Sequence, residues 1–146
     1  MNSLIIFGER IKDLIFDNKI SVETLANELS TDKSSVYKWL RNEEIPTLEN
    51  LIKIADYFNS SIDFLLGRSS EYIFSQFKKC PPFNLQLQNI IKNKHISEYR
   101  ICKDTKISRA NFYMWKKSIH LPQPESLIRL ADYFDCSIDY LIGRED

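Results

Sequence analysis

The sequence has little glycine, little cysteine and no net charge, and each scarcity excludes a class of protein. Its three glycines are far apart along the chain, so no glycine-rich loop can form around a phosphate group. Its three cysteines form no C-x-x-C pair, and their odd number argues against a disulfide framework. We therefore expect a protein of the reducing cytoplasm, with Cys102 as a small core residue. No apolar run approaches the ~18 residues that a membrane helix needs, so we expect no membrane association.

The sequence also offers no recognisable catalytic or metal-binding pattern. His95 and His120 stand alone, and no Ser/His/Asp or Cys/His arrangement can be identified. Asp63 and Asp139 each fall in the first turn of an expected helix, where the helix dipole favours a carboxylate. We expect neither an enzyme nor a bound cofactor, metal or small-molecule ligand.

A repeat organises the chain. Residues 45–68 (IPTLENLIKIADYFNSSIDFLLGR) return as residues 121–144 (LPQPESLIRLADYFDCSIDYLIGR), at a constant offset of 76 residues. Because a repeat sets the unit of folding, we expect two small domains, residues 1–68 and 83–146. Residues 69–82 then form a short linker.

Charge is divided unevenly between the two copies. Residues 1–73 carry 8 basic and 12 acidic side chains, whereas residues 74–146 carry 12 basic and 8 acidic ones. A moderate basic balance is compatible with nucleic-acid binding, so the second copy gives the stronger signal.

Apolar residues recur at helical spacing, and no stretch alternates with the period of a strand, so we expect an all-α fold. The first helix should cover residues 3–18. Four further helices should begin after Ser21, Asp32, Thr47 and Ser61, which are typical N-caps, and the last should end at Gly67. In the second copy the corresponding signals are Ser97, Ser108, Pro124 and Gly143. The expected core includes Trp39 and Trp115, the two tyrosines Tyr57 and Tyr133, and on the fourth helix Leu48, Leu51, Ile52, Ala55 and Phe58.

The linker is too apolar to be a free connection. Tyr72, Ile73, Phe74 and Phe77 can form two helical turns that pack on a domain or across a dimer interface. The prolines Pro81 and Pro82 then interrupt any helix.

Residues 22–39 show the pattern of two helices joined by a short turn. Ala26 is small where the two helices would cross, and Val36 and Trp39 lie three residues apart on the inner face of the second helix. The second copy has Cys102, Phe112 and Trp115 at the same spacing. A helix pair of this kind, with a polar exposed half on its second helix, indicates a helix-turn-helix.

The chain thereby resembles the Xre or lambda-repressor-like helix-turn-helix family of bacterial and phage regulators, over residues 7–68 and again over residues 83–144. The resemblance rests on the spacing of Ala26, Val36 and Trp39, on Pro46, and on the endings SIDFLLGR and SIDYLIGR. It implies two tandem five-helix DNA-binding domains.

The sequence departs from the family pattern at several positions. Ser30 and Lys106 stand where the family usually has a glycine with left-handed backbone, a substitution that costs on the order of 1 kcal/mol. Val22 and Glu98 replace the glutamine that often begins the second helix. Glu43 and Glu44 make the loop after the third helix acidic in the first copy, whereas the second copy has Lys116 and Lys117 there.

The resemblance implies two sets of DNA contacts. Base-reading side chains would come from the third helix of each copy: Lys33, Ser34, Tyr37 and Lys38, and Arg109, Ala110, Asn111, Tyr113 and Met114. Contacts to backbone phosphates would come from Ser21, Arg41, Ser97, Arg100, Lys116 and Lys117.

We therefore expect a sequence-specific, repressor-like regulator that binds double-stranded DNA through the third helix of each copy. Two half-sites on one face of DNA lie about 34 Å apart. Either a homodimer or an intrachain pseudo-dimer can supply two reading helices. The alternative is a protein-interaction module that keeps the fold, with the acidic first domain not binding DNA.

Overall fold

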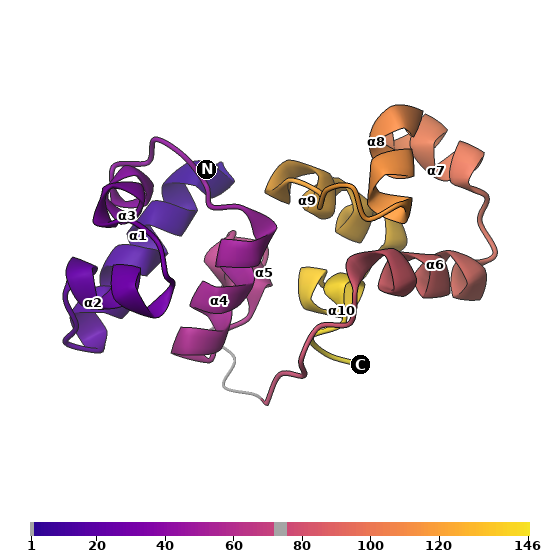
Figure 1. Ribbon diagram of the computed structural model, residues 1–146. Coiled ribbons are helices and arrows are strands. Elements are labelled where there is room, and N and C mark those ends of the chain that lie inside the picture. The colour runs from indigo at the N-terminus through magenta and orange to yellow at the C-terminus, as the bar shows by residue number, and fades with distance from the viewer. Residues whose placement is uncertain (1, 72–75) are drawn as a thin grey trace. The chain divides into compact units, whose positions relative to one another are not determined.

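The computed structural model describes residues 2–71 and 76–146, and these form ten α-helices with no strand among them (Figure 1). The chain divides into two compact units, Met1–Gln76 and Phe77–Asp146. The expected all-α architecture with five helices in each copy is confirmed. In the described ranges, no helix has both the length and the apolar character needed to cross a membrane.

In the first unit α3 packs on α1 and α2, and α5 packs on α1 and α4. The helices are α1 (Ser3–Asp17), α2 (Val22–Glu28), α3 (Lys33–Leu40), α4 (Leu48–Phe58) and α5 (Ile62–Leu65). The inner faces of α1, α2 and α3 therefore meet in one core.

The second unit repeats these contacts. Here α8 packs on α6 and α7, and α10 packs on α6 and α9. The helices are α6 (Phe83–Lys94), α7 (Glu98–Thr105), α8 (Arg109–Lys116), α9 (Pro124–Phe134) and α10 (Ile138–Ile142).

Helix boundaries follow the predicted signals. The hydroxyl oxygens of Ser21, Thr47 and Ser61 accept bonds from amide groups in the first turns of α2, α4 and α5. Ser97 and Ser108 do the same for α7 and α8. Asp32 is the N-cap residue of α3, although its side chain makes no capping bond. Pro124 begins α9, while Gly67 and Gly143, with φ of +83° and +86°, follow the last helices of their units.

The core contains most of the residues expected there. Trp39 and Trp115 are buried, as are Ala26 and Cys102 at the helix crossings. The prediction was wrong for Ile52 and Tyr57 of α4 and for Tyr133 of α9: Ile52 and Tyr133 are half-buried and Tyr57 is 39% exposed, whereas Ile54 is fully buried. Ile54 is three residues after Leu51 and four before Phe58, so it shares their side of the helix, and Ile52 and Tyr57 lie beside it.

An aromatic contact fixes the third helix on the first in both units. The Phe7 and Trp39 rings meet edge to face, with centroids 6.3 Å apart, and Phe83 and Trp115 do so at 6.4 Å. Edge-to-face pairs of this kind are favourable beyond their buried area. In each unit, therefore, the same contact between two aromatic rings holds the third helix against the first.

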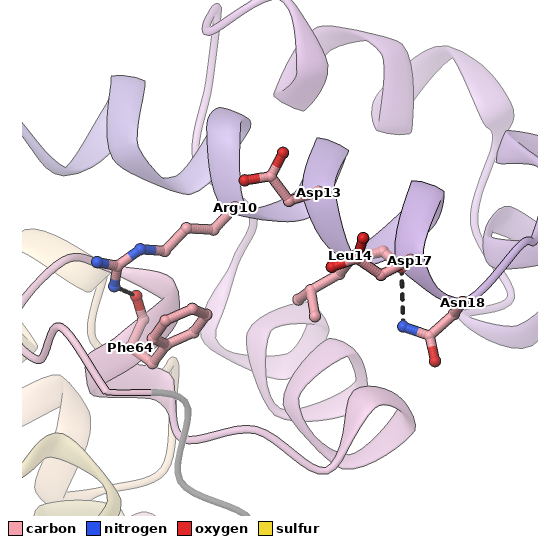
Figure 2. Close-up of a pocket in the computed structure, with 6 residues that line it drawn as sticks. All are labelled: Arg10, Asp13, Leu14, Asp17, Asn18 and Phe64. Atoms are coloured by element: carbon pink, nitrogen blue, oxygen red, sulfur yellow. Dashed lines mark hydrogen bonds between the residues drawn. The ribbon is translucent and has the colours of Figure 1, made fainter.

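A second repeated contact joins the first and last helices. Arg10 donates to the carbonyl oxygens of Phe64 and Ser69, and its guanidinium lies over the Phe64 ring, beside a pocket that Asp13 and Asp17 also line (Figure 2). At the equivalent position of the second unit, Gln86 donates to the carbonyl oxygen of Tyr140 at 3.0 Å. In both copies, therefore, a side chain of the first helix donates a hydrogen bond to a backbone carbonyl oxygen of the last helix.

An aspartate–arginine ion pair closes each last helix. Asp63 pairs with Arg68, with side chains 10% and 21% exposed, and Asp139 pairs with Arg144, with side chains 1% and 0% exposed. The ring of Phe77 covers the guanidinium of Arg144 at 4.0 Å, and the Lys78 amide donates to the Arg144 carbonyl. Phe77 thus packs within the second unit, whereas the predicted helical turns over residues 72–75 lie outside the described residues.

Gly8 lies against the loop that follows α3. A Cβ atom at this position would lie 2.1 Å from Asn42 Oδ1 and 2.8 Å from the Trp39 carbonyl oxygen. At the equivalent positions the second unit has Asn84 and Ser118. A smaller loop residue thus accompanies a larger helix residue in the second copy.

Candidate nucleic-acid interface

The turn between the two helices of each pair has the expected left-handed backbone. Ser30 has φ of +53° and Lys106 has φ of +62°. Neither is a glycine, so each turn carries a modest strain that the packing of the helix pair offsets. The turn sets the direction in which α3 and α8 leave it.

The predicted base-reading residues of the first unit lie together on the exposed side of α3. Lys33, Ser34, Tyr37 and Lys38 are all exposed, while Val36 and Trp39 on the opposite side are buried. Lys33 and Lys38 make no ion pair with a described residue. This face can therefore offer two cations, a hydroxyl and a phenol to a ligand.

The second unit presents an equivalent face on α8. Arg109, Ala110, Asn111 and Tyr113 are exposed, and Met114 is half-buried. The guanidinium of Arg109 lies 5.9 Å from the centre of the Tyr99 ring on α7. A guanidinium and an amide on one exposed face can make paired hydrogen bonds to guanine and to adenine respectively.

Three of the four predicted phosphate-binding cations already contact a carboxylate. Arg41 forms two bonds to Glu43 at 2.8 and 3.3 Å, Arg100 lies 3.1 Å from Asp104, and Lys116 lies 2.6 Å from Glu98. These exposed pairs are weak individually, yet each reduces the positive potential available to a phosphate. Lys117 lies 5.8 Å from the centre of the Tyr113 ring.

Hydrogen bonds perturb three groups near these pairs. The bond from Arg41 lowers the pKa of Glu43. The bond that the Tyr133 hydroxyl donates to Asp104, at 2.7 Å, lowers the pKa of Asp104 and raises that of Tyr133. Glu43 and Asp104 are therefore charged at neutral pH and compete with DNA for the neighbouring arginines.

The two predicted serine contacts lie at the starts of α2 and α7. Ser21 and Ser97 are exposed, and each hydroxyl oxygen accepts one capping bond. Since a hydroxyl both donates and accepts, the hydrogen of Ser97 can still be donated to a phosphate oxygen. The Ser21 hydroxyl lies 2.9 Å from that of Thr24 and shares a hydrogen bond with it.

A shallow cleft at the α7–α8 turn was not anticipated from the sequence. Its lining includes Lys103, Lys106 and Arg109, together with Tyr99, Cys102, Ile107 and Ser108. Comparing the two copies residue by residue gives the signal that could have found it: Asn27 and Ser30 in the first copy correspond to Lys103 and Lys106.

Comparisons with known proteins agree with the helix-turn-helix fold. A model described as "Helix-turn-helix" matches residues 13–65, and one described as "Cro/C1-type HTH DNA-binding domain" matches residues 86–146. Together they cover most of the chain. Neither describes an enzyme, in agreement with the sequence-based expectation.

A phage protein is similar to part of the chain. The cryptic phage CTXphi transcriptional repressor RstR of Vibrio cholerae serotype O1 is 46% identical over 44 residues, which are 30% of this chain and 39% of that protein. The chain thus spans well under half the length of this relative. The chain has no significant match among solved structures. From the two model matches and the helix-turn-helix geometry of both units, the chain belongs to the Xre or lambda-repressor-like helix-turn-helix family and carries two copies of the domain in tandem.

Proposed function

We propose that this protein is a sequence-specific transcriptional regulator of the repressor type, which inserts α8, and less strongly α3, into the major groove of DNA. The observation that carries the proposal is the two-sided character of α8. Phe112 and Trp115 bury one side, and Arg109, Ala110 and Asn111 occupy the exposed side. A recognition helix requires this division, because it must be held from behind while base edges are read in front. The phage repressor that resembles part of the chain supports the same function.

The second unit binds DNA with the higher affinity, for electrostatic reasons. Its charge balance is +4, whereas that of the first unit is −4. In the first unit the loop after α3 also exposes Glu43 and Glu44. A carboxylate facing a phosphate disfavours binding, since most of the affinity for DNA comes from neutralising phosphates.

The same acidic loop favours a second candidate function for the first unit, namely binding a protein with a basic surface. Binding of DNA and binding of a basic protein by the first unit can be distinguished by the ligand that binds and by how its affinity depends on salt. Charge reversal of Lys33 would weaken DNA binding if α3 reads DNA, and would leave it unchanged if the first unit binds only protein.

Selection of duplexes from a random pool with the full chain tests the main proposal. We expect one enriched sequence, whose symmetry reports whether a homodimer or two copies in one chain occupy it. Arg109→Ala and Asn111→Ala should each weaken binding by about 1–3 kcal/mol and relax the preference at one base pair. Gln88→Ala, an exposed change on α6, is the matched control. Recovery of no preferred sequence would contradict the proposal.

A further inference from the structure

We propose that the cleft at the α7–α8 turn, lined by Lys103, Lys106 and Arg109, holds a phosphate group of the DNA backbone. The inference rests on the proposed function and adds a contact that neither the family pattern nor the sequence indicated. It also explains how the second unit binds phosphates although Arg100 and Lys116 are engaged by carboxylates.

Three cationic side chains are among the residues that line the cleft. Lys103 comes from the last turn of α7, Lys106 from the turn itself, and Arg109 from the first turn of α8. Its lining contains no carboxylate. A cleft lined by three positive charges from three successive segments favours an anion such as phosphate over a neutral ligand.

The three cations have no carboxylate partner within ion-pair distance in the described parts of the chain. Lys103, Lys106 and Arg109 form no ion pair there, whereas Arg100 and Lys116 nearby each hold a carboxylate. An unpaired exposed lysine loses no ion pair when a phosphate binds. Phosphate binding in this cleft therefore displaces no carboxylate from a described residue.

The floor of the cleft is apolar, and its rim offers a hydroxyl donor. Cys102 and Ile107 are buried and close the bottom. Burial raises the pKa of the Cys102 thiol, and the charge of Arg109 opposes this rise more than that of Glu98 adds to it. The Ser108 hydroxyl oxygen accepts a hydrogen bond from the backbone N–H of Asn111 at 3.1 Å, which leaves the hydroxyl hydrogen to be donated to a phosphate oxygen.

The first unit provides an internal comparison. The residues equivalent to Tyr99, Lys103, Lys106 and Ser108 are Glu23, Asn27, Ser30 and Asp32, so the first unit has two fewer cations and two more carboxylates here. Of the three cations only Lys33, the equivalent of Arg109, remains. The same fold therefore carries the cationic cleft in one copy and an acidic surface in the other.

The position of the cleft gives the phosphate site a role in recognition. Ser108 and Arg109 belong both to the cleft and to the end of α8 that is proposed to read bases. A phosphate fixed there sets the register of α8 along the groove. The cleft thus supplies affinity and alignment, and the exposed side of α8 supplies sequence preference.

The test compares two doubly substituted full-length proteins on the selected duplex. Lys103→Gln with Lys106→Asn removes the cleft charges, and asparagine tolerates the left-handed backbone of residue 106. Lys92→Gln with Lys94→Gln, both exposed in the last turn of α6, removes the same charge elsewhere in the same unit. Affinity is measured by fluorescence anisotropy between about 50 and 200 mM salt.

We expect the cleft variant to bind at least about fivefold more weakly. Its salt slope should be shallower by about 0.9 for each phosphate that it no longer neutralises. The α6 variant should keep the slope of the original protein. Lys103→Arg with Lys106→Arg keeps the charge and should keep both affinity and slope, which also separates a charge effect from a folding defect.

Three outcomes would overturn the inference. If the cleft variant matches the α6 variant in affinity and slope, the cleft is not a phosphate site, although the regulator function stands. Inorganic phosphate at constant ionic strength could shift the backbone amide resonances of Lys103 and Lys106 while the cleft variant keeps the salt slope of the original protein for DNA binding. The ligand of the cleft would then be free phosphate and not the DNA backbone. If the unsubstituted protein selects no duplex, the proposed function fails, and the phosphate site fails with it.

Discussion

Replacing Asp139 by asparagine should destabilise the second unit strongly, because it removes one member of a fully buried ion pair. The Asp139 and Arg144 side chains are 1% and 0% exposed, so the guanidinium of Arg144 would lose a carboxylate partner that water cannot reach to replace. Breaking such a pair costs about 3–5 kcal/mol. A domain of this size has a total stability of roughly 4–10 kcal/mol, so the loss is about a third of it or more.

The equivalent change in the first unit is the matched control. The Asp63 and Arg68 side chains are 10% and 21% exposed, so water can partly solvate the arginine that remains. We therefore expect Asp63→Asn to cost about 1–2 kcal/mol, well below the loss at Asp139. The amide is close in size to the carboxylate, so neither change leaves a large cavity.

The assay uses the single tryptophan of each unit. In a Trp39→Phe background the fluorescence of Trp115 reports the second unit, and in a Trp115→Phe background Trp39 reports the first. Urea unfolding of each variant against its own background gives the change in free energy of unfolding. Equal losses at the two positions would refute the reasoning, because burial would then not set the cost of removing the carboxylate partner.

Three further predictions concern packing, affinity and titration. Gly8→Ala should lower the free energy of unfolding of the first unit by about 1–2 kcal/mol, since the close approach to the Trp39 carbonyl and Asn42 outweighs the gain in helix propensity. Adding Asn42→Ser should restore part of the lost stability, measured by urea titration. If no stability is recovered, the close approach to Asn42 is contradicted. Glu43→Gln with Glu44→Gln should strengthen binding of the selected duplex, most at low salt, because two like charges leave the loop and Arg41 is released from Glu43; unchanged anisotropy titrations would show that this loop does not approach DNA. Asp104→Asn should lower the pKa of Tyr133 towards its ordinary value, seen as a lower midpoint in the absorbance difference of tyrosinate. Because the Tyr133 pKa is raised in the folded protein, the bond stabilises the second unit below the ordinary tyrosine pKa of 10.0 and loses this effect as pH rises through the raised value; an unchanged midpoint would exclude the Tyr133–Asp104 bond in solution.

The features predicted most accurately from the sequence depend on local chemistry. Serine and threonine caps at Ser21, Thr47 and Ser97 bond amides three residues ahead, so their position alone marks the start of a helix. The repeat added the pairing of helices, because each pattern occurs twice with the same spacing. Burial of Trp39 and Trp115 follows from the same periodicity.

The features that escaped prediction depend on which surfaces meet in three dimensions. Glu98 and Lys116 are 18 residues apart, and only the crossing of α7 and α8 brings them within 2.6 Å. Lys103 and Lys106 were missed because each alone resembles an ordinary surface lysine, and their significance lies in the absence of carboxylates from the cleft lining. Ile52 and Ile54 have the same side chain, and the rotation of α4 about its axis decides which one is buried.

Because Arg10 and Gln86 both donate to backbone carbonyl oxygens, segments of the two copies should be interchangeable. Every residue supplies a carbonyl oxygen, so the first helix of either copy finds its acceptor on the last helix of the other. Gly8 and Asn42 both precede the repeated stretch that begins at residue 45, and they would move together. Chimaeras joined at residues 45 and 121 should therefore fold, and they would move the reading helix and its flanking charges as one cassette.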